Sequence, residues 1–201
     1  MTQALTASDF AEYLSDDEIS KMAPLLDRLK ILDEQKSSQE NYLKFVKKIW
    51  PTFIEGKHHK IYADKLQKVA DGKIKRLIIN MPPRHTKSEF ASYLFPAWLM
   101  GRRPDLKIIQ ATHTAELAVG FGRKVKNLID SDDFREIFPD IKLASDAKAA
   151  GRWSTNSGGE YYAVGVGGAL AGRGADLCII DDPVSEQDAL SPTALDGIYE
   201  W

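Results

Sequence analysis

The 201-residue sequence contains a single cysteine, Cys178, and no apolar run long enough to cross a membrane. One cysteine forms no disulfide within the chain, and Cys178 has no neighbouring metal-ligand residues, so we expect it to pack in a buried apolar run. Residues 1–5 also lack the basic region and apolar core that are typical of a secretion signal. We therefore expect a protein of a reducing, cytosolic compartment that makes no membrane contact.

The chain also has little net charge, −2 at pH 7, but its charges are unevenly distributed. Residues 1–40 hold nine acidic and four basic residues, whereas residues 41–90 hold twelve basic and four acidic ones. A basic segment of this kind can contact the phosphates of a nucleic acid. It can equally be the solvated face of a helix, and charge alone does not distinguish these two interpretations.

The pattern of apolar residues changes near residue 40. Residues 8–34 are typical of one or two short acidic helices, because Pro24 limits an uninterrupted helix, and the polar residues 35–39 predict a linker. We therefore expect an acidic helical segment over residues 1–39 and a separate domain over residues 40–201. The length of the chain supports one α/β domain with a full core.

From residue 74 onward, short apolar runs alternate with helical patterns. The predicted strands cover residues 77–81, 106–111, 161–166 and 177–181, and the predicted helices cover residues 86–99, 114–129, 183–190 and 193–201. Continuous apolar strands separated by helices favour a mainly parallel sheet with helices on both faces. The expected fold class is therefore α/β.

Two glycines are missing from a loop that otherwise has the order of a phosphate-binding loop. The standard pattern is Gly-x-x-x-x-Gly-Lys-Ser/Thr, and residues 81–88 are Met-Pro-Pro-Arg-His-Thr-Lys-Ser, between a predicted strand and a predicted helix. We predict that Lys87 lies between the β- and γ-phosphates of a nucleotide and that Ser88 binds Mg²⁺. The alternative is a polar turn with Thr86 as the helix N-cap. The loop residues expected to contact the nucleotide are Pro83, Arg84, His85, Thr86, Lys87 and Ser88.

A pair of carboxylates ends the predicted strand 177–181. We predict that Asp181 holds Mg²⁺ and that Asp182 polarises the attacking water, because an ionised carboxylate only accepts hydrogen bonds and can align one water with the γ-phosphate. Asp182 is one methylene shorter than a glutamate, which shortens its reach. The alternative is an Asp-Asp-Pro helix start without catalysis, and the phosphate-binding pattern upstream favours the metal site over it.

Several motifs occur together in this order: Met-Pro-Pro-Arg-His-Thr-Lys-Ser at 81–88, Phe-Pro-Ala-Trp at 95–98, Gly-Arg-Gly-Ala-Asp at 172–176 and Ile-Ile-Asp-Asp-Pro at 179–183. With these motifs the chain resembles the large terminase subunit of tailed bacteriophages, the ATP-driven motor that pulls viral DNA into a preformed capsid. The resemblance covers roughly residues 40–201, and residues 1–40 show no comparable signature.

The resemblance implies a P-loop NTPase domain of the additional-strand type that uses ATP and Mg²⁺. It also implies double-stranded DNA, a small terminase subunit, a portal protein and further copies of the chain in a ring as partners. The expected location is the host cytoplasm, transiently at the portal of the viral procapsid. A helicase or remodelling ATPase shares the site chemistry, and a non-catalytic module that binds DNA or a portal is the alternative from another class.

The resemblance also implies roles for single residues. Arg84 matches an arginine that contacts phosphate within the loop, and Asp182 falls where many relatives place a catalytic glutamate. Thr86 replaces a glycine, and because a positive φ would be costly for threonine we expect the loop to take a different local path there. Arg173 lies in a glycine-rich loop, from which we hypothesise that it reaches a neighbouring subunit's site and stabilises transition-state charge. The alternative is a solvated arginine in a glycine-rich turn.

Aromatic residues before residue 77 occupy the region where related ATPases contact adenine. Trp50 or His59 could stack on the base, and a role in core packing is an equally good interpretation. His113, at the end of a predicted strand, could face the site, whereas Trp98 falls at helical spacing and is predicted to be core.

The family also carries a coupling motif after the Asp-Asp strand and a C-terminal nuclease domain. The sequence ends at Trp201, before either segment could occur. We therefore expect a part of an ATPase domain without nuclease activity. We also expect the 201-residue chain to bind nucleotide and to hydrolyse ATP poorly.

Overall fold

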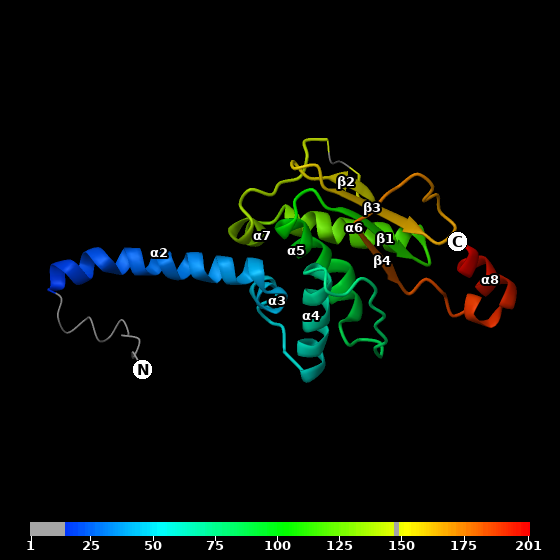
Figure 1. Cartoon of the computed structure of the whole chain (residues 1–201), viewed down its shortest axis with the longest axis horizontal. Helices are drawn as coiled ribbons and strands as arrows, with labels where there is room; N and C mark the ends of the chain where they lie inside the picture. The colour runs from blue at the N-terminus through cyan, green and yellow to red at the C-terminus, as the bar shows by residue number, and fades with distance from the viewer. Residues whose placement is uncertain (1–14, 147–148) are drawn as a thin grey trace. The chain divides into compact units, whose positions relative to one another are not determined.

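A four-stranded sheet and the helices around it give the chain an α/β fold (Figure 1). The computed structural model describes residues 15–146 and 149–201. The chain divides into two compact units, residues 1–37 and residues 38–201. The division falls close to residue 40, where the sequence pattern changes.

The helices in the described part of the chain are α2 (Asp16–Glu40), α3 (Tyr42–Ile49), α4 (Lys57–Ala70), the π-helix η1 (Glu89–Leu94), α5 (Phe95–Arg102), α6 (Ala115–Ile129), α7 (Asp132–Ile137), the 3₁₀-helix η2 (Asp188–Leu190) and α8 (Pro192–Glu200). The strands are β1 (Lys107–Thr112), β2 (Arg152–Ser154), β3 (Glu160–Gly165) and β4 (Leu177–Asp181).

The sheet is open and mixed, with the strand order β2-β3-β1-β4. β1 lies at its centre and pairs in parallel with β3 and β4, whereas the short β2 pairs antiparallel with β3. In this register Gln110 of β1 lies opposite Ile179 of β4, and Thr112 lies opposite Asp181. The carboxyl ends of β1 and β4 therefore meet at one edge of the sheet, where Asp181 is located.

Three of the four predicted strands form within one residue of their predicted bounds, but the prediction for residues 77–81 is wrong. Among the described residues, residues 75–81 form no backbone–backbone hydrogen bond. Leu77 and Ile79 pack partly against the core, while Ile78 between them is 87% exposed. The segment alternates between packed and exposed residues as a strand does, but it pairs with none of the strands in the described part of the chain.

The two faces of the sheet differ, which corrects the expectation of helices on both. Side chains of one face, including Ile108 and Tyr161, join the main core with helical residues such as Val125 of α6. In the described part of the chain, the small apolar cluster on the other face is packed against by Leu170 and Trp201. Cys178 is exposed on this face rather than buried, because β4 is an edge strand.

Two predictions for helices were also wrong. The helix α2 runs without a break to Glu40, through Pro24 and through the predicted linker at residues 35–39. Proline removes one helical hydrogen bond, and the good helix formers after Pro24 continue the helix despite that loss. Of the predicted helix 183–190, only residues 188–190 are helical. Residues 8–14, which belong to the predicted acidic helices, lie outside the described residues.

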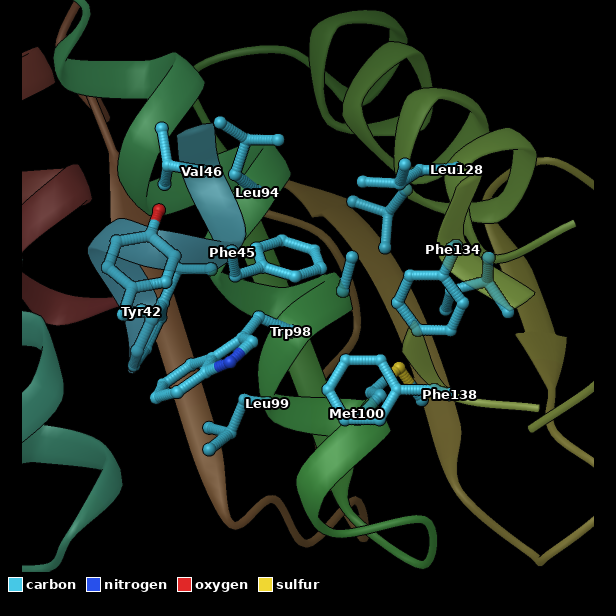
Figure 2. Packing of buried hydrophobic residues seen from close by; sticks show 14 of the residues in the cluster. Tyr42, Phe45, Val46, Leu94, Trp98, Leu99, Met100, Leu128, Phe134 and Phe138 are labelled. Carbon is cyan, nitrogen blue, oxygen red and sulfur yellow. The ribbon is translucent and has the colours of Figure 1, made fainter. Parts of the chain in front are cut away.

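Aromatic side chains from several helices form the centre of the core (Figure 2). Trp98 of α5 is fully buried, as predicted, and its ring centroid lies 5.2 Å from that of Tyr42 of α3. The rings of Phe134 and Phe138, in and after α7, are tilted by 37° with centroids 5.1 Å apart, and both lie beside Phe45. This packing anchors α5, and through it the helical segment that begins at the candidate site.

Candidate functional site

The two segments that were predicted to form a site are in contact. Lys87 Nζ lies 3.2 Å from Asp181 Oδ1, and it also donates to Asp182 Oδ1. The contact joins the start of the helical segment that runs from residue 87 to residue 102 with the end of β4. Burial alone would lower the pKa of Lys87, but its hydrogen bond to Asp182 and the charge of Asp181 outweigh burial and raise this pKa. Lys87 is therefore a cation held by two carboxylates.

A cavity of about 560 Å³ opens beside this contact. Pockets of a few hundred Å³ are typical of sites that hold a small molecule. The cavity includes all the loop residues predicted to contact a nucleotide except His85, whose Nδ1 lies 2.9 Å from the Pro83 carbonyl oxygen. The lining residues are Met81, Pro82, Pro83, Arg84, Thr86, Lys87, Ser88, Glu89 and Asp182.

The loop adopts a backbone conformation that favours glycine. Arg84 has φ = 63° and Thr86 has φ = 62°, both in the left-handed region, and Asp182 on the other side of the cavity has φ = 46°. Thr86 is where the standard pattern has its second glycine, and its positive φ contradicts the expectation that the loop takes a different local path there. For a β-branched residue this conformation is unfavourable and must be held by its surroundings.

His59 supplies part of that restraint. The backbone N–H of Gly56 donates to His59 Nδ1 at 2.9 Å, so the ring's proton is on Nε2, which lies 2.9 Å from Thr86 Oγ1. Thr86 Oγ1 in turn donates to the His85 carbonyl oxygen at 2.6 Å. Burial, followed by the neighbouring His58, lowers the pKa of His59. His59 therefore contacts the outside of the loop as a neutral ring and does not line the cavity.

Tyr62 is a second restraint from α4. Its hydroxyl donates to the Lys87 carbonyl oxygen at 2.8 Å, and its ring stacks on Phe90 with centroids 5.4 Å apart. Burial, together with the charge of Asp181, raises the pKa of Tyr62, so this hydroxyl keeps its proton. The helix α4 thus holds the first turn of the helical segment that carries Lys87.

Asp181 is buried and has a partner that sequence reasoning missed. Its Oδ2 accepts a hydrogen bond from Ser92 Oγ at 2.8 Å, and Gln110 Nε2 donates to Ser92 Oγ at 3.4 Å. Both partners are fully buried. The available signals were the polar Gln110 inside the apolar strand Ile-Ile-Gln-Ala and a serine one helical turn after Ser88.

Three other candidates do not line the cavity. Trp50 donates from Nε1 to Thr52 Oγ1 at 3.0 Å. The guanidinium of Arg173 lies over the ring of Tyr162, 3.9 Å from its centroid, as a cation–π pair within the same chain. His113 Nδ1 is buried without a hydrogen-bond partner among the described residues. Stacking of Trp50 on a base and a reach of Arg173 into a neighbouring subunit stay predictions.

The oxygens around the cavity fit a hard divalent cation. Ser88 and Asp182 line the cavity, and Asp181, which is not a lining residue, has its Oδ1 3.2 Å from Nζ of the lining residue Lys87. Mg²⁺ prefers oxygen ligands, and in nucleotide sites the protein supplies one or two of them while phosphates and water supply the rest. The described residues contain no cluster of three or more His, Cys, Asp or Glu that could hold a metal by themselves.

Comparison of the chain with protein-family models, with curated proteins and with solved structures finds no match. Within residues 15–146 and 149–201, no helix has the length and apolar character needed to cross a membrane. The fold and the geometry around Lys87 are therefore the basis for a functional proposal.

Proposed function

We propose that this chain is a Mg²⁺-dependent ATPase of the P-loop type and that it belongs to a viral DNA-packaging motor. The observation that carries the ATP-binding part is the contact of Lys87 with both Asp181 and Asp182 beside the cavity. A lysine and two carboxylates, brought together from distant parts of the chain, are the charged groups that a magnesium–triphosphate site needs.

The proposed chemistry begins with a change of partner at Lys87, from carboxylates to phosphate. Lys87 now neutralises two carboxylates, and a triphosphate entering the cavity would compete for the same cation. Once Lys87 binds phosphate, Asp182 is released, and this exposed carboxylate can accept a hydrogen bond from the attacking water. Asp181 and Ser88 would hold Mg²⁺, which supplies charge neutralisation at the phosphate oxygens. Arg84 borders the same cavity and would add positive charge.

The packaging part of the proposal rests on the motifs at 81–88, 95–98 and 172–183, which resemble those of large terminases. On this proposal, the additional-strand ATPase works in a ring of copies at a procapsid portal in the host cytoplasm. It acts with a small terminase subunit and translocates double-stranded DNA. Arg173 would leave Tyr162 to act on a neighbouring copy, since a cation–π pair on the surface is worth only about 0.5–1 kcal/mol.

Calorimetric titration with ATP and Mg²⁺ tests the nucleotide site. We expect the wild-type chain to bind and Lys87→Ala to bind roughly 10–100-fold more weakly, because a hydrogen bond to a charged group contributes about 1.5–3 kcal/mol. Lys107→Ala is the matched control, since Lys107 also pairs with a carboxylate, Glu160 at 3.3 Å, at the other end of β1. It should bind as the wild type does.

Two results would contradict the proposal. One is a folded wild-type chain that does not bind ATP with Mg²⁺. The other is binding that Lys87→Ala leaves unchanged, because the nucleotide would then lie elsewhere. The first result would favour a non-catalytic module that binds DNA or a portal. Binding that depends on Lys87 would leave a packaging motor and a helicase to be separated by an assay of DNA translocation into procapsids.

A further inference from the structure

The carboxylate of Asp181 is held on its buried side by two polar residues that the proposed function does not use. Asp181 is 7% exposed, and Ser92 and Gln110 are both 0% exposed. A serine and a glutamine in a core lose their hydration, so each needs a hydrogen-bond partner to offset the loss. Here the partners form a chain from Gln110 Nε2 to Ser92 Oγ at 3.4 Å and from Ser92 Oγ to Asp181 Oδ2 at 2.8 Å.

Which atom donates in each of these two hydrogen bonds follows from which side-chain atoms carry protons. The amide nitrogen of Gln110 only donates, so the oxygen of Ser92 accepts from it. The single proton of the Ser92 hydroxyl is then directed to Asp181 Oδ2, which accepts. With the amide of Gln110 reversed, its oxygen would compete for that proton and Asp181 Oδ2 would lose its donor. In this order Ser92 donates to Asp181, and Oδ2 of Asp181 is occupied by that donor.

The other oxygen of Asp181 has a different environment. Oδ1 lies 3.2 Å from the Nζ of Lys87, which lines the cavity. Ser92 belongs to the π-helix η1 and lies four residues after Ser88, so the two hydroxyls fall on the same side of one helical segment. The segment thus presents one hydroxyl beside the cavity and a second one to the back of the carboxylate at the end of β4.

We infer that Ser92 is a positioning residue for the metal-binding carboxylate. Its hydroxyl occupies Oδ2 of Asp181 and leaves Oδ1 as the single oxygen available to a divalent cation, and Gln110 fixes the orientation of the hydroxyl. The inference rests on the proposed function, since it gives a role to residues behind the same site. It also gives a reason for the two buried polar side chains in an otherwise apolar part of the core.

The test is the Mg²⁺ dependence of ATP binding by the full 201-residue chain, measured by calorimetry at a series of Mg²⁺ concentrations. Ser92→Ala should raise the Mg²⁺ concentration for half-maximal binding about tenfold, the effect typical of removing a partner that orients a metal ligand. The affinity for ATP without metal should stay unchanged. A purely structural role would instead weaken binding with and without metal alike. The matched control is Ser38→Ala, at a buried serine of α2, which should change neither quantity.

Two further variants test the roles of the Gln110 amide and the Ser92 hydroxyl separately. Gln110→Met removes the amide donor at similar volume and should shift the Mg²⁺ dependence in the same direction by a smaller factor. Ser92→Thr returns the hydroxyl and should restore the wild-type dependence. If Asp181→Ala abolishes the Mg²⁺ dependence while Ser92→Ala retains the wild-type one, the inference is wrong and the proposed function stands. If the wild type shows no Mg²⁺-dependent binding, both are wrong.

Discussion

Two apolar runs of five residues lead into the candidate site, and only one of them becomes a strand. Residues 77–81 are Leu-Ile-Ile-Asn-Met, and residues 177–181 are Leu-Cys-Ile-Ile-Asp. In both, alternate residues pack partly against the main core, and the residues between them are exposed. Residues 177–181 form β4 beside β1, whereas residues 75–81 form no backbone–backbone hydrogen bond within the described part of the chain.

The two runs have similar strand propensity and the same alternation of packed and exposed residues. The difference between them therefore shows that a neighbouring strand decides whether such a run becomes a strand. It also divides the candidate site into two unlike halves. Asp181 is fixed by the sheet and buried, so its half is organised before any ligand binds. The loop at residues 82–88 is held by side chains of α4, namely His59 and Tyr62, and contains left-handed residues. The loop half is the half that a ligand has the freedom to reshape.

The largest effect should come from deleting the inward-facing isoleucine of each run. We expect Ile179→Ala to lower the free energy of unfolding by about 2 kcal/mol and Ile79→Ala by about 1 kcal/mol, at or below the usual range because both side chains are only partly buried. The unpaired segment around Ile79 can relax into the space, whereas β4 is held by its ladder with β1. Urea unfolding of the two variants measures the difference.

The outward-facing neighbours are the controls. Ile78 and Ile180 are 87% and 59% exposed, and their alanine variants should stay within about 0.5 kcal/mol of the wild type. Equal losses for Ile79→Ala and Ile179→Ala would mean that residues 77–81 are held as firmly as a paired strand. The contrast between the two halves of the site would then be wrong.

A smaller effect should come from the backbone of the loop. Thr86→Gly and Thr86→Ala both remove the hydroxyl, but only alanine keeps a Cβ at φ = 62°. The glycine variant should therefore be the more stable of the two by about 1 kcal/mol in urea unfolding.

Gly120→Ala in α6 is a matched comparison for Thr86. A Cβ at Gly120 would meet nothing within 4 Å, and alanine is favoured over glycine inside a helix by about 1 kcal/mol. The preference between glycine and alanine should therefore reverse between the two positions. If alanine is the more stable residue at position 86 as well, the left-handed conformation of the loop is not the ground state in solution.

Much of the sheet was predictable from the sequence, because β1, β3 and β4 are continuous apolar runs between helical patterns. The contact of Lys87 with Asp181 and Asp182 was predictable too, since both sides carry recognisable loop and strand-end patterns. The exposure of Cys178 was not, because an apolar run does not say whether its strand is central or at an edge.

The residues behind the site were harder to foresee. Ser92 and Gln110 lie in separate elements, and their partnership depends on how η1 packs against β1 and β4. His59 was considered as a partner of adenine, whereas the structure has it in contact with Thr86. A single polar residue in an apolar segment indicates that a partner exists, but only the tertiary packing says which one.

The smallest effect should be a pH dependence of the loop half. Burial is the largest cause that lowers the pKa of His59 below its ordinary value of about 6.5, and the neighbouring His58 and His85 lower it further. The charge of Glu55 acts in the opposite direction but does not outweigh them. The unfolded chain therefore binds the proton more readily. The contribution of His59 to stability is present above about pH 6.5 and is lost as the pH falls from there through the lower pKa of the folded state.

Hydrogen exchange between pH 7.5 and pH 5.5, corrected for the intrinsic rates, would measure this loss in each half of the site separately. The amides that report on the loop are those of Gly56, which donates to His59 Nδ1, and Phe90, which donates to the Thr86 carbonyl oxygen. Both should lose protection as the pH falls, because protonation of His59 Nδ1 removes the acceptor for Gly56 N–H and weakens the restraint on Thr86. Amides of β4 should keep theirs, since the ladder with β1 involves no histidine. In His59→Gln the loop should lose protection less steeply with pH. Parallel losses in the loop and in β4 would instead mean that the whole domain opens as one unit, and that the sheet does not organise its half of the site independently of the loop.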